Sequence, residues 1–208
     1  MTKLYASVAA IGTLAFLGAS TWYVLSNRAD DQFADCRESQ VAGGDIGGPF
    51  TLVNTAGKTV TDKDVLKQPS LVYFGYTFCP DVCPVDMARN ADAVDILAKQ
   101  GIKVTPVFIT IDPERDTPEA LADYAANLSP DLVALSGSAD QVKTAAQAYK
   151  AFYAKQDTGD EYYLMDHSTF TFLMLPDTGF AEFFRREVTA EQMAESVACF
   201  VKSGKTDT

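Results

Sequence analysis

Residues 70–84, SLVYFGYTFCPDVCP, join a short apolar run to two cysteines four positions apart. The run Ser70–Tyr76 has the length and composition of a buried β-strand. The following stretch 87–101, MARNADAVDILAKQG, has apolar residues at helical spacing and is closed by Gly101. Cys79 and Cys83 are therefore predicted to lie at a strand-to-helix turn.

The segments on either side of this turn alternate between strand and helix signals. Thr117 is a plausible N-cap with Pro118 at the first helical position, and Ser138 or Asp140 can cap a later helix. The order ββαβαβαββα predicts an α/β domain with a central mixed sheet covered by helices, the thioredoxin-like plan. The expected strands cover parts of 49–60, 70–76, 104–111, 132–135, 169–175 and 180–186, and the expected helices cover 84–101, 117–128, 138–152 and 189–203.

The amino-terminal region contains a stretch that could cross a membrane. Residues 4–26 carry no charge, and about 20 apolar residues span a bilayer as a helix. The aromatic residues Trp22 and Tyr23 favour an uncleaved anchor over a signal peptide cut after a small residue. We therefore divide the 208 residues into a transmembrane anchor at 1–26, a polar, glycine-rich linker at 27–48 and a folded domain at 49–208.

The charges around the anchor predict which side of the membrane the domain occupies. Lys3 precedes the apolar stretch, whereas Arg28 is followed at once by Asp30 and Asp31. This weak positive-inside bias places the domain on the non-cytoplasmic side, where disulfides persist. The formal net charge of −11 makes nucleic acid a poor partner.

Cys79 and Cys83 allow three kinds of chemistry. Residues four apart in a helical turn have Cα atoms about 6 Å apart, within the range that a disulfide permits, so the cysteines can form a redox pair. They can also supply half of a metal site, because a helix N-terminus favours the thiolate. A structural disulfide is the third reading, but such a short loop removes little entropy from the unfolded chain. Since Pro84 disfavours helical backbone at Cys83, the local geometry stays open.

His167 is the only histidine of the chain. It lies in a polar break, Asp166-His167-Ser168, just before a predicted strand. In a thioredoxin-like plan, the loop that enters this strand faces the cysteine turn. Two thiolates and one imidazole suit copper, with zinc as the competitor, and three ligands leave one position open.

Three segments together resemble the Sco/SenC family, the membrane-anchored copper proteins of cytochrome c oxidase assembly. They are GYTFCPDVCP (75–84), FITIDPERDTPEAL (108–121) and DHSTFTFLMLPDTG (166–179). The resemblance implies a thioredoxin-like, peroxiredoxin-related fold with an added β-hairpin. It also implies one copper ion per chain, Cu(I) or Cu(II), held by Cys79, Cys83 and His167.

The resemblance implies a copper metallochaperone that delivers copper to the binuclear copper site of cytochrome c oxidase subunit II. A separate copper donor protein would load it, and the inner membrane would hold it, with the domain on the periplasmic or intermembrane side. The alternative is a thiol-disulfide oxidoreductase that uses Cys79 and Cys83 to reduce the cysteines of that site. Whether the chain is an enzyme stays open. A thiol peroxidase of the same fold is a weaker match, because Thr77-x-Cys79 is one residue shorter than the peroxiredoxin motif.

The remaining charged and cysteine residues near these motifs have simpler expected roles. We expect the charges of Asp81 and Asp86, and those of 112–116 (Asp112, Glu114, Arg115, Asp116), to be solvated and not to ligate metal. Cys36 and Cys199 lie outside the three motifs. In an oxidising compartment two leftover cysteines favour pairing, so we predict a Cys36–Cys199 disulfide that ties the linker to the last helix.

Overall fold

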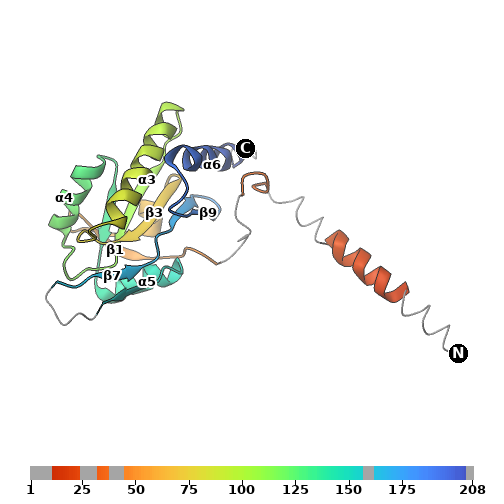
Figure 1. Cartoon of the computed structure of the whole chain (residues 1–208), viewed down its shortest axis with the longest axis horizontal. Helices are drawn as coiled ribbons and strands as arrows, with labels where there is room; N and C mark the ends of the chain where they lie inside the picture. Colours follow the sequence, from red (N-terminus) through yellow and green to blue (C-terminus); the bar gives the residue numbers. More distant parts are fainter. Residues whose placement is uncertain (1–10, 24–31, 38–44, 157–161, 205–208) are drawn as a thin grey trace.

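The structure, a computed structural model, describes residues 11–23, 32–37, 45–156 and 162–204. A mixed sheet of seven strands forms the centre of the domain, in the order β2-β1-β5-β4-β3-β8-β9 (Figure 1). β3 pairs in parallel with β4, and β4 with β5, whereas β1, β2, β8 and β9 join antiparallel. The strands are β1 (Thr51–Asn54), β2 (Thr59–Thr61), β3 (Ser70–Gly75), β4 (Thr105–Thr110), β5 (Val133–Ser136), β8 (Thr171–Leu175) and β9 (Gly179–Phe184).

Helices cover both faces of the sheet. Figure 1 shows α3 and α6 side by side on one face and α5 on the other. Leu71 of β3 packs in the cluster that contains α3 and α6, while Phe74 turns the opposite way to meet Tyr149, the residue that ends α5. This alternation follows from the two-residue period of a strand. The helices are α2 (Asp62–Val65), α3 (Val82–Lys99), α4 (Pro118–Leu128), α5 (Ala139–Ala148) and α6 (Ala190–Ser203).

The predicted thioredoxin-like α/β architecture is confirmed. Thr117 accepts a hydrogen bond from Ala120 N at the start of α4, with Pro118 in the first turn, and Ser138, not Asp140, caps α5. The sequence prediction missed α2 and a separate two-stranded antiparallel sheet, β6 (Tyr153–Lys155) with β7 (Met165–His167). Strands of three residues are too short to show a periodic pattern.

The amino-terminal prediction falls partly outside the described residues. Residues 11–23 form a helix in which every residue but Ser20 is exposed, whereas residues 1–10 and 24–31 lie outside the described part of the chain. Within the described ranges, no helix has the length and apolarity needed to cross a bilayer. The anchor at 1–26 and the linker at 27–48 stay predictions.

The predicted Cys36–Cys199 disulfide is present. The two Cα atoms are 5.6 Å apart, and the bridge joins residues 163 positions apart in the sequence. Beside it, the ring of Phe33 packs against Phe200 of α6 with centroids 5.4 Å apart. The short segment 32–37 is therefore fastened to α6 both covalently and by apolar packing.

Candidate metal centre

The two cysteines lie on either side of the start of α3. β3 ends at Gly75, the chain turns so that Cys79 N donates to the carbonyl of Tyr76 (3.2 Å), and α3 begins at Val82. Asp81, the N-cap residue, makes no side-chain cap. Instead the amide of Cys83 donates to Cys79 Sγ over 3.3 Å, so the sulfur satisfies one of the amides that a helix start leaves unpaired. Cys83 is thus helical despite the proline that follows it.

His167 meets this turn from the end of β7. Its Nε2 is 3.4 Å from Cys83 Sγ, and its Nδ1 is 2.9 Å from the carbonyl oxygen of Ser168. A carbonyl only accepts, so Nδ1 must donate, and in the neutral ring the lone pair of Nε2 faces the cysteines. The residue was expected in a loop, but it belongs to a short strand whose partner, Tyr153, keeps it in register.

One soft donor set results from these placements. A sulfur from each of Cys79 and Cys83 and a ring nitrogen from His167 lie within 4.8 Å of one another. Cys83 is fully buried, Cys79 is 8% exposed and His167 is half-buried. Two sulfurs and an imidazole fit copper or zinc. Across the described ranges, no other cluster of histidine, cysteine or carboxylate side chains meets the same criterion.

The two thiols have opposite acidities. A hydrogen bond from the thiol of Cys83 lowers the pKa of Cys79 to about 3, and a hydrogen bond from the amide of Cys83 lowers it further against the opposing effect of burial. The same hydrogen bond and burial raise the pKa of Cys83 far above its usual range. In the metal-free, reduced protein the two sulfurs therefore share one proton at neutral pH, and the negative charge is favoured on Cys79. The structure contains both residues as free cysteines.

Two residues of β3 and one of α3 shape the pocket of Cys83. A Cβ on Gly75 would lie 2.9 Å from Cys83 Sγ, so the close approach needs glycine. The ring of Tyr73 meets His167 edge-on at 6.1 Å between centroids, and its hydroxyl donates to Asp86 over 2.9 Å. Asp86 is 2% exposed and pairs with Arg186. The prediction that Asp86 is solvated was wrong, whereas Asp81 is exposed as expected.

The carboxylates of residues 112 and 116 are also buried, contrary to expectation. Asp116 accepts hydrogen bonds from the amide and hydroxyl of Thr77, at 3.0 and 2.6 Å, and from the hydroxyl of Thr110. Burial raises its pKa, and these hydrogen bonds oppose the rise. Because Thr77 is two residues before Cys79, Asp116 holds the cysteine turn against the end of β4.

Asp112 belongs to a second buried group beside the turn. It pairs with Arg115 and accepts a hydrogen bond from the hydroxyl of Tyr163 over 2.8 Å. The Arg115 guanidinium lies 3.7 Å from the ring centroid of Tyr163 and 4.9 Å from that of Phe78. Only Glu114 of this motif is solvated as predicted. The parallel β3–β4 pair brings their carboxyl ends together, which is the signal that could have placed these acids near the cysteines.

Comparisons with known proteins agree on one family. The family model described as SCO1/SenC matches residues 38–202. Protein SenC of Rhodobacter capsulatus is 46% identical over 206 residues, which cover 99% of this chain and 93% of that protein.

Two solved structures extend this result. The crystal structure of Arabidopsis thaliana ScoI with copper bound matches with a TM-score of 0.72 and 36% identity, over 76% of this chain and 99% of that one. BsSco, described as a member of the Sco family of cytochrome c oxidase assembly proteins with a disulfide switch, matches with a TM-score of 0.62 and 28% identity, over 77% and 94%.

Proposed function

The chain belongs to the SCO1/SenC family, and from this premise we propose that it is a copper metallochaperone. It holds one copper ion through Cys79, Cys83 and His167 and passes the ion to the binuclear copper site of cytochrome c oxidase subunit II. The observation that carries the proposal is the convergence of two sulfurs and one imidazole nitrogen within 4.8 Å at the start of α3. The copper-bound relative from Arabidopsis thaliana supports the choice of copper.

Unequal burial of the three donors supports delivery rather than storage. Cys83 lies beneath the surface, whereas Cys79 and His167 form the outer side of the site. A set of three donors also leaves a coordination position for an incoming ligand. An acceptor thiol can therefore approach from outside and replace the outer donors first, and Cys83 releases the ion last.

We place this activity on the non-cytoplasmic side of a membrane, with residues 1–26 as the anchor. The Cys36–Cys199 disulfide supports this location, because such bonds persist in oxidising compartments. A copper donor protein would load the site there. To test the location, a cysteine is engineered into the linker and intact cells are treated with a membrane-impermeant thiol reagent. We expect labelling in intact cells, and labelling only after lysis would overturn the proposed location.

Transfer of the metal tests the proposed function. The full-length chain is loaded with one equivalent of copper under anaerobic conditions and mixed with a copper-free binuclear-copper domain whose cysteines are already reduced. We expect copper to move to the acceptor and to produce the absorption of its metal centre. Copper that stays on the chain at equilibrium, with an acceptor that takes up free copper normally, would refute the proposal.

A second candidate, reduction of a partner disulfide, is favoured by the acidity of Cys79. Its thiolate would attack one sulfur of the partner disulfide and release the other as a thiolate. Cys83 would then lose its proton, attack Cys79 and release the second partner sulfur. The chain ends with a Cys79–Cys83 disulfide and the partner with two thiols, a balanced two-electron exchange. The copper-free, reduced chain is mixed with an oxidised acceptor domain. If the disulfide of that domain stays intact, this role is excluded.

A further inference from the structure

The hydrophobic side chains that the domain leaves exposed are not scattered over its surface. Among residues 45–156 and 162–204, five large hydrophobic side chains are between 42% and 84% exposed. They are Phe78, Val85, Phe152, Tyr162 and Leu164, and we call them the apolar rim. Isolated exposed apolar residues are ordinary, whereas a contiguous group marks an interaction surface.

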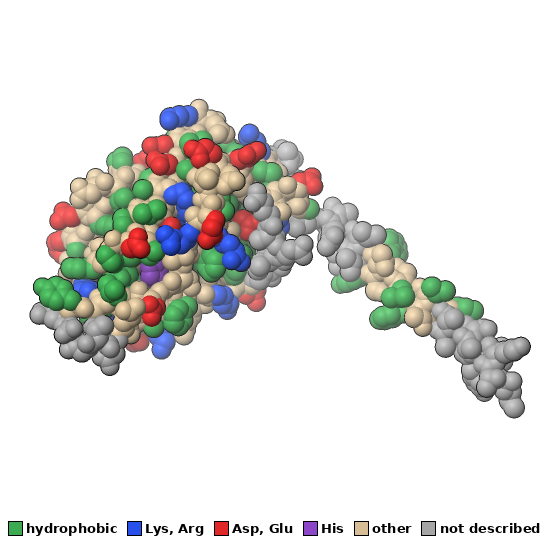
Figure 2. Space-filling model, viewed as in Figure 1, with side chains coloured by type: hydrophobic (Ala, Val, Ile, Leu, Met, Phe, Trp, Pro, Cys, Tyr) green, Lys and Arg blue, Asp and Glu red, His purple; other side chains and the backbone are tan. Residues whose placement is uncertain are grey.

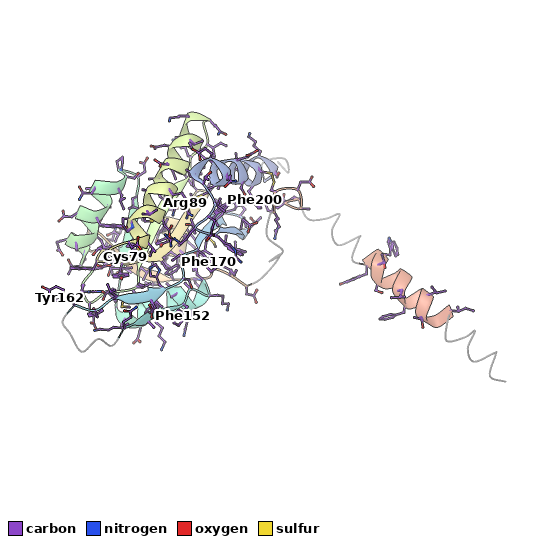
Figure 3. The ribbon with its side chains drawn as sticks, in the orientation of Figure 1. Cys79, Arg89, Phe152, Tyr162, Phe170 and Phe200 are labelled. Carbon is purple, nitrogen blue, oxygen red and sulfur yellow. A yellow bond between two sulfur atoms is a disulfide. The ribbon has the colours of Figure 1, made fainter. Side chains whose placement is uncertain are left out.

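All members of the apolar rim lie in the segments that carry the metal donors or, for Phe152, in the segment paired with one of them. Phe78 precedes Cys79, and Val85 follows Cys83 by two positions. Phe152 exchanges two hydrogen bonds with Ser168, the neighbour of His167, at 2.9 and 3.0 Å. Figure 3 shows Cys79, Phe152 and Tyr162 at one end of the domain, and Figure 2 shows hydrophobic side chains beside the single histidine of the chain.

The apolar rim has two halves: Phe78 and Val85 lie at the cysteine turn, and Phe152, Tyr162 and Leu164 lie on the histidine side. Contacts between other side chains join these halves. The Arg115 guanidinium lies over Phe78 from the cysteine turn and over Tyr163 from the histidine side. The amide of Met165, next to Leu164, donates to the hydroxyl of Tyr76 over 3.3 Å. The cysteine turn and the β6–β7 sheet thus form one continuous surface with the donor set inside it.

The charges of the same segments indicate what can cover this surface. Asp81, Glu114 and Asp166 are exposed there, and Lys155 is engaged with Glu114 at 3.4 Å. A second copy of the chain would bring the same acids and a net charge of −11, and an anionic lipid surface would repel them as well. An apolar protein face with basic or neutral groups at its border is complementary.

We propose that the apolar rim is the docking surface for a partner protein that presents paired cysteine thiols beneath an apolar, non-acidic face. The inference rests on the proposed function and names the partner class of the same site. Docking on the apolar rim would bring partner sulfurs to the outer donors, Cys79 and His167, and would exclude water while ligands exchange. Large aromatic side chains at the centre of an interface contribute most of its affinity.

Two matched double variants of the full-length chain test this surface. F78S with F152S removes apolar area from both halves, and F78L with F152L keeps most of it. The probe is a copper-free, reduced binuclear-copper domain, and copper(I) is used throughout so that no redox step is involved. We expect the serine pair to lower the second-order transfer rate constant about tenfold or more and the leucine pair about threefold or less, while both keep the wild-type copper(I) affinity within about twofold.

Complex formation between copper-free chain and acceptor, measured by calorimetry, separates the two proposals. If the acceptor binds but takes up no copper, and the serine pair weakens this binding, the apolar rim stands as the docking surface and the chaperone function is rejected. Transfer at the wild-type rate by the serine pair would overturn the apolar rim as a docking surface and leave the chaperone intact. The docking proposal would also be overturned if the serine pair abolished self-association or vesicle binding and left acceptor binding unchanged.

Discussion

The chain contains two cysteine pairs with nearly opposite properties. Cys36 and Cys199 are 163 positions apart and joined by a disulfide, whereas Cys79 and Cys83 are four apart and free. In the chain-entropy model, closing the long loop stabilises the fold by about 5 kcal/mol and closing the short one by about 2 kcal/mol. The first pair is suited to holding the fold together, and the second gains little from being closed.

The surroundings of the two cysteine pairs also fit these different roles. Cys36 and Cys199 pack among apolar side chains of α6 and the segment 32–37. Cys79 and Cys83 lie beside an imidazole and at a helix start. Cysteine chemistry depends on the groups that stabilise the thiolate, so only the second pair is prepared to bind metal or exchange disulfides.

Removing one donor sulfur should have the largest effect. Cys83→Ser leaves one sulfur and one nitrogen, and we expect copper(I) affinity to fall at least about 1,000-fold, or about 4 kcal/mol. Competition with a chromogenic copper(I) chelator measures the change. The matched control, Cys36→Ser with Cys199→Ser, should keep wild-type affinity, and equal losses in both variants would erase the distinction between the pairs.

The same control variant should show the largest loss of fold stability. Without the long-range disulfide, we expect the free energy of unfolding to fall by about 2–5 kcal/mol, measured by guanidinium denaturation of the copper-free protein. Cys83→Ser should change the free energy of unfolding much less, because it breaks no covalent link. A loss below about 1 kcal/mol in the double variant would mean that the bridge contributes little to holding segment 32–37.

Asp116 tests whether buried carboxylates position the cysteine turn. Asp116→Ala leaves the amide and hydroxyl of Thr77 without their acceptor, and we expect a loss of about 1–3 kcal/mol in stability together with weaker copper binding. Asp116→Asn keeps an oxygen that can accept from the Thr77 amide and should retain most of both. An alanine variant with unchanged stability and copper affinity would contradict the positioning role.

The pH dependence of alkylation should separate the two free thiols. Because the pKa of Cys79 is lowered to about 3, its thiolate persists as the pH falls, and its rate with iodoacetamide should change less than about twofold between about pH 5 and 8. An ordinary thiol would react about 1,000-fold faster at the upper pH. Peptide mapping of the reduced, metal-free protein identifies the modified residue. A tenfold rise in the Cys79 rate per pH unit would contradict the assigned thiolate.

Sequence reasoning located the elements whose signals are local. The apolar strand before Cys79, the Thr117 and Ser138 caps and the helix after Pro84 all follow from neighbouring residues, and the structure confirms them. The three-residue strand that carries His167 has no such signal, because its register is set by pairing with Tyr153. Its place was expected from the thioredoxin-like plan, but its strand structure was not.

The buried acids show where reasoning from single segments stops. Asp86, Asp112 and Asp116 lie in segments whose sequences are typical of solvated turns and helix starts, yet each is buried. Each has at least one partner far away in the sequence: Arg186 for Asp86, Tyr163 for Asp112 and Thr77 for Asp116. Burial of a carboxylate is tolerated only when such partners are present, and the distant ones are brought close only by the tertiary structure.

The most direct test of the proposed copper site is copper binding by His167→Ala. The wild-type chain should bind one equivalent of Cu(II) with a thiolate-to-copper absorption band. The variant should lose affinity for Cu(II) far more than for Cu(I), because two sulfurs still suit the softer ion. Titration of both ions into the two proteins, followed by absorption and chelator competition, measures the difference. Full Cu(II) affinity and an unchanged absorption band in His167→Ala would contradict the account.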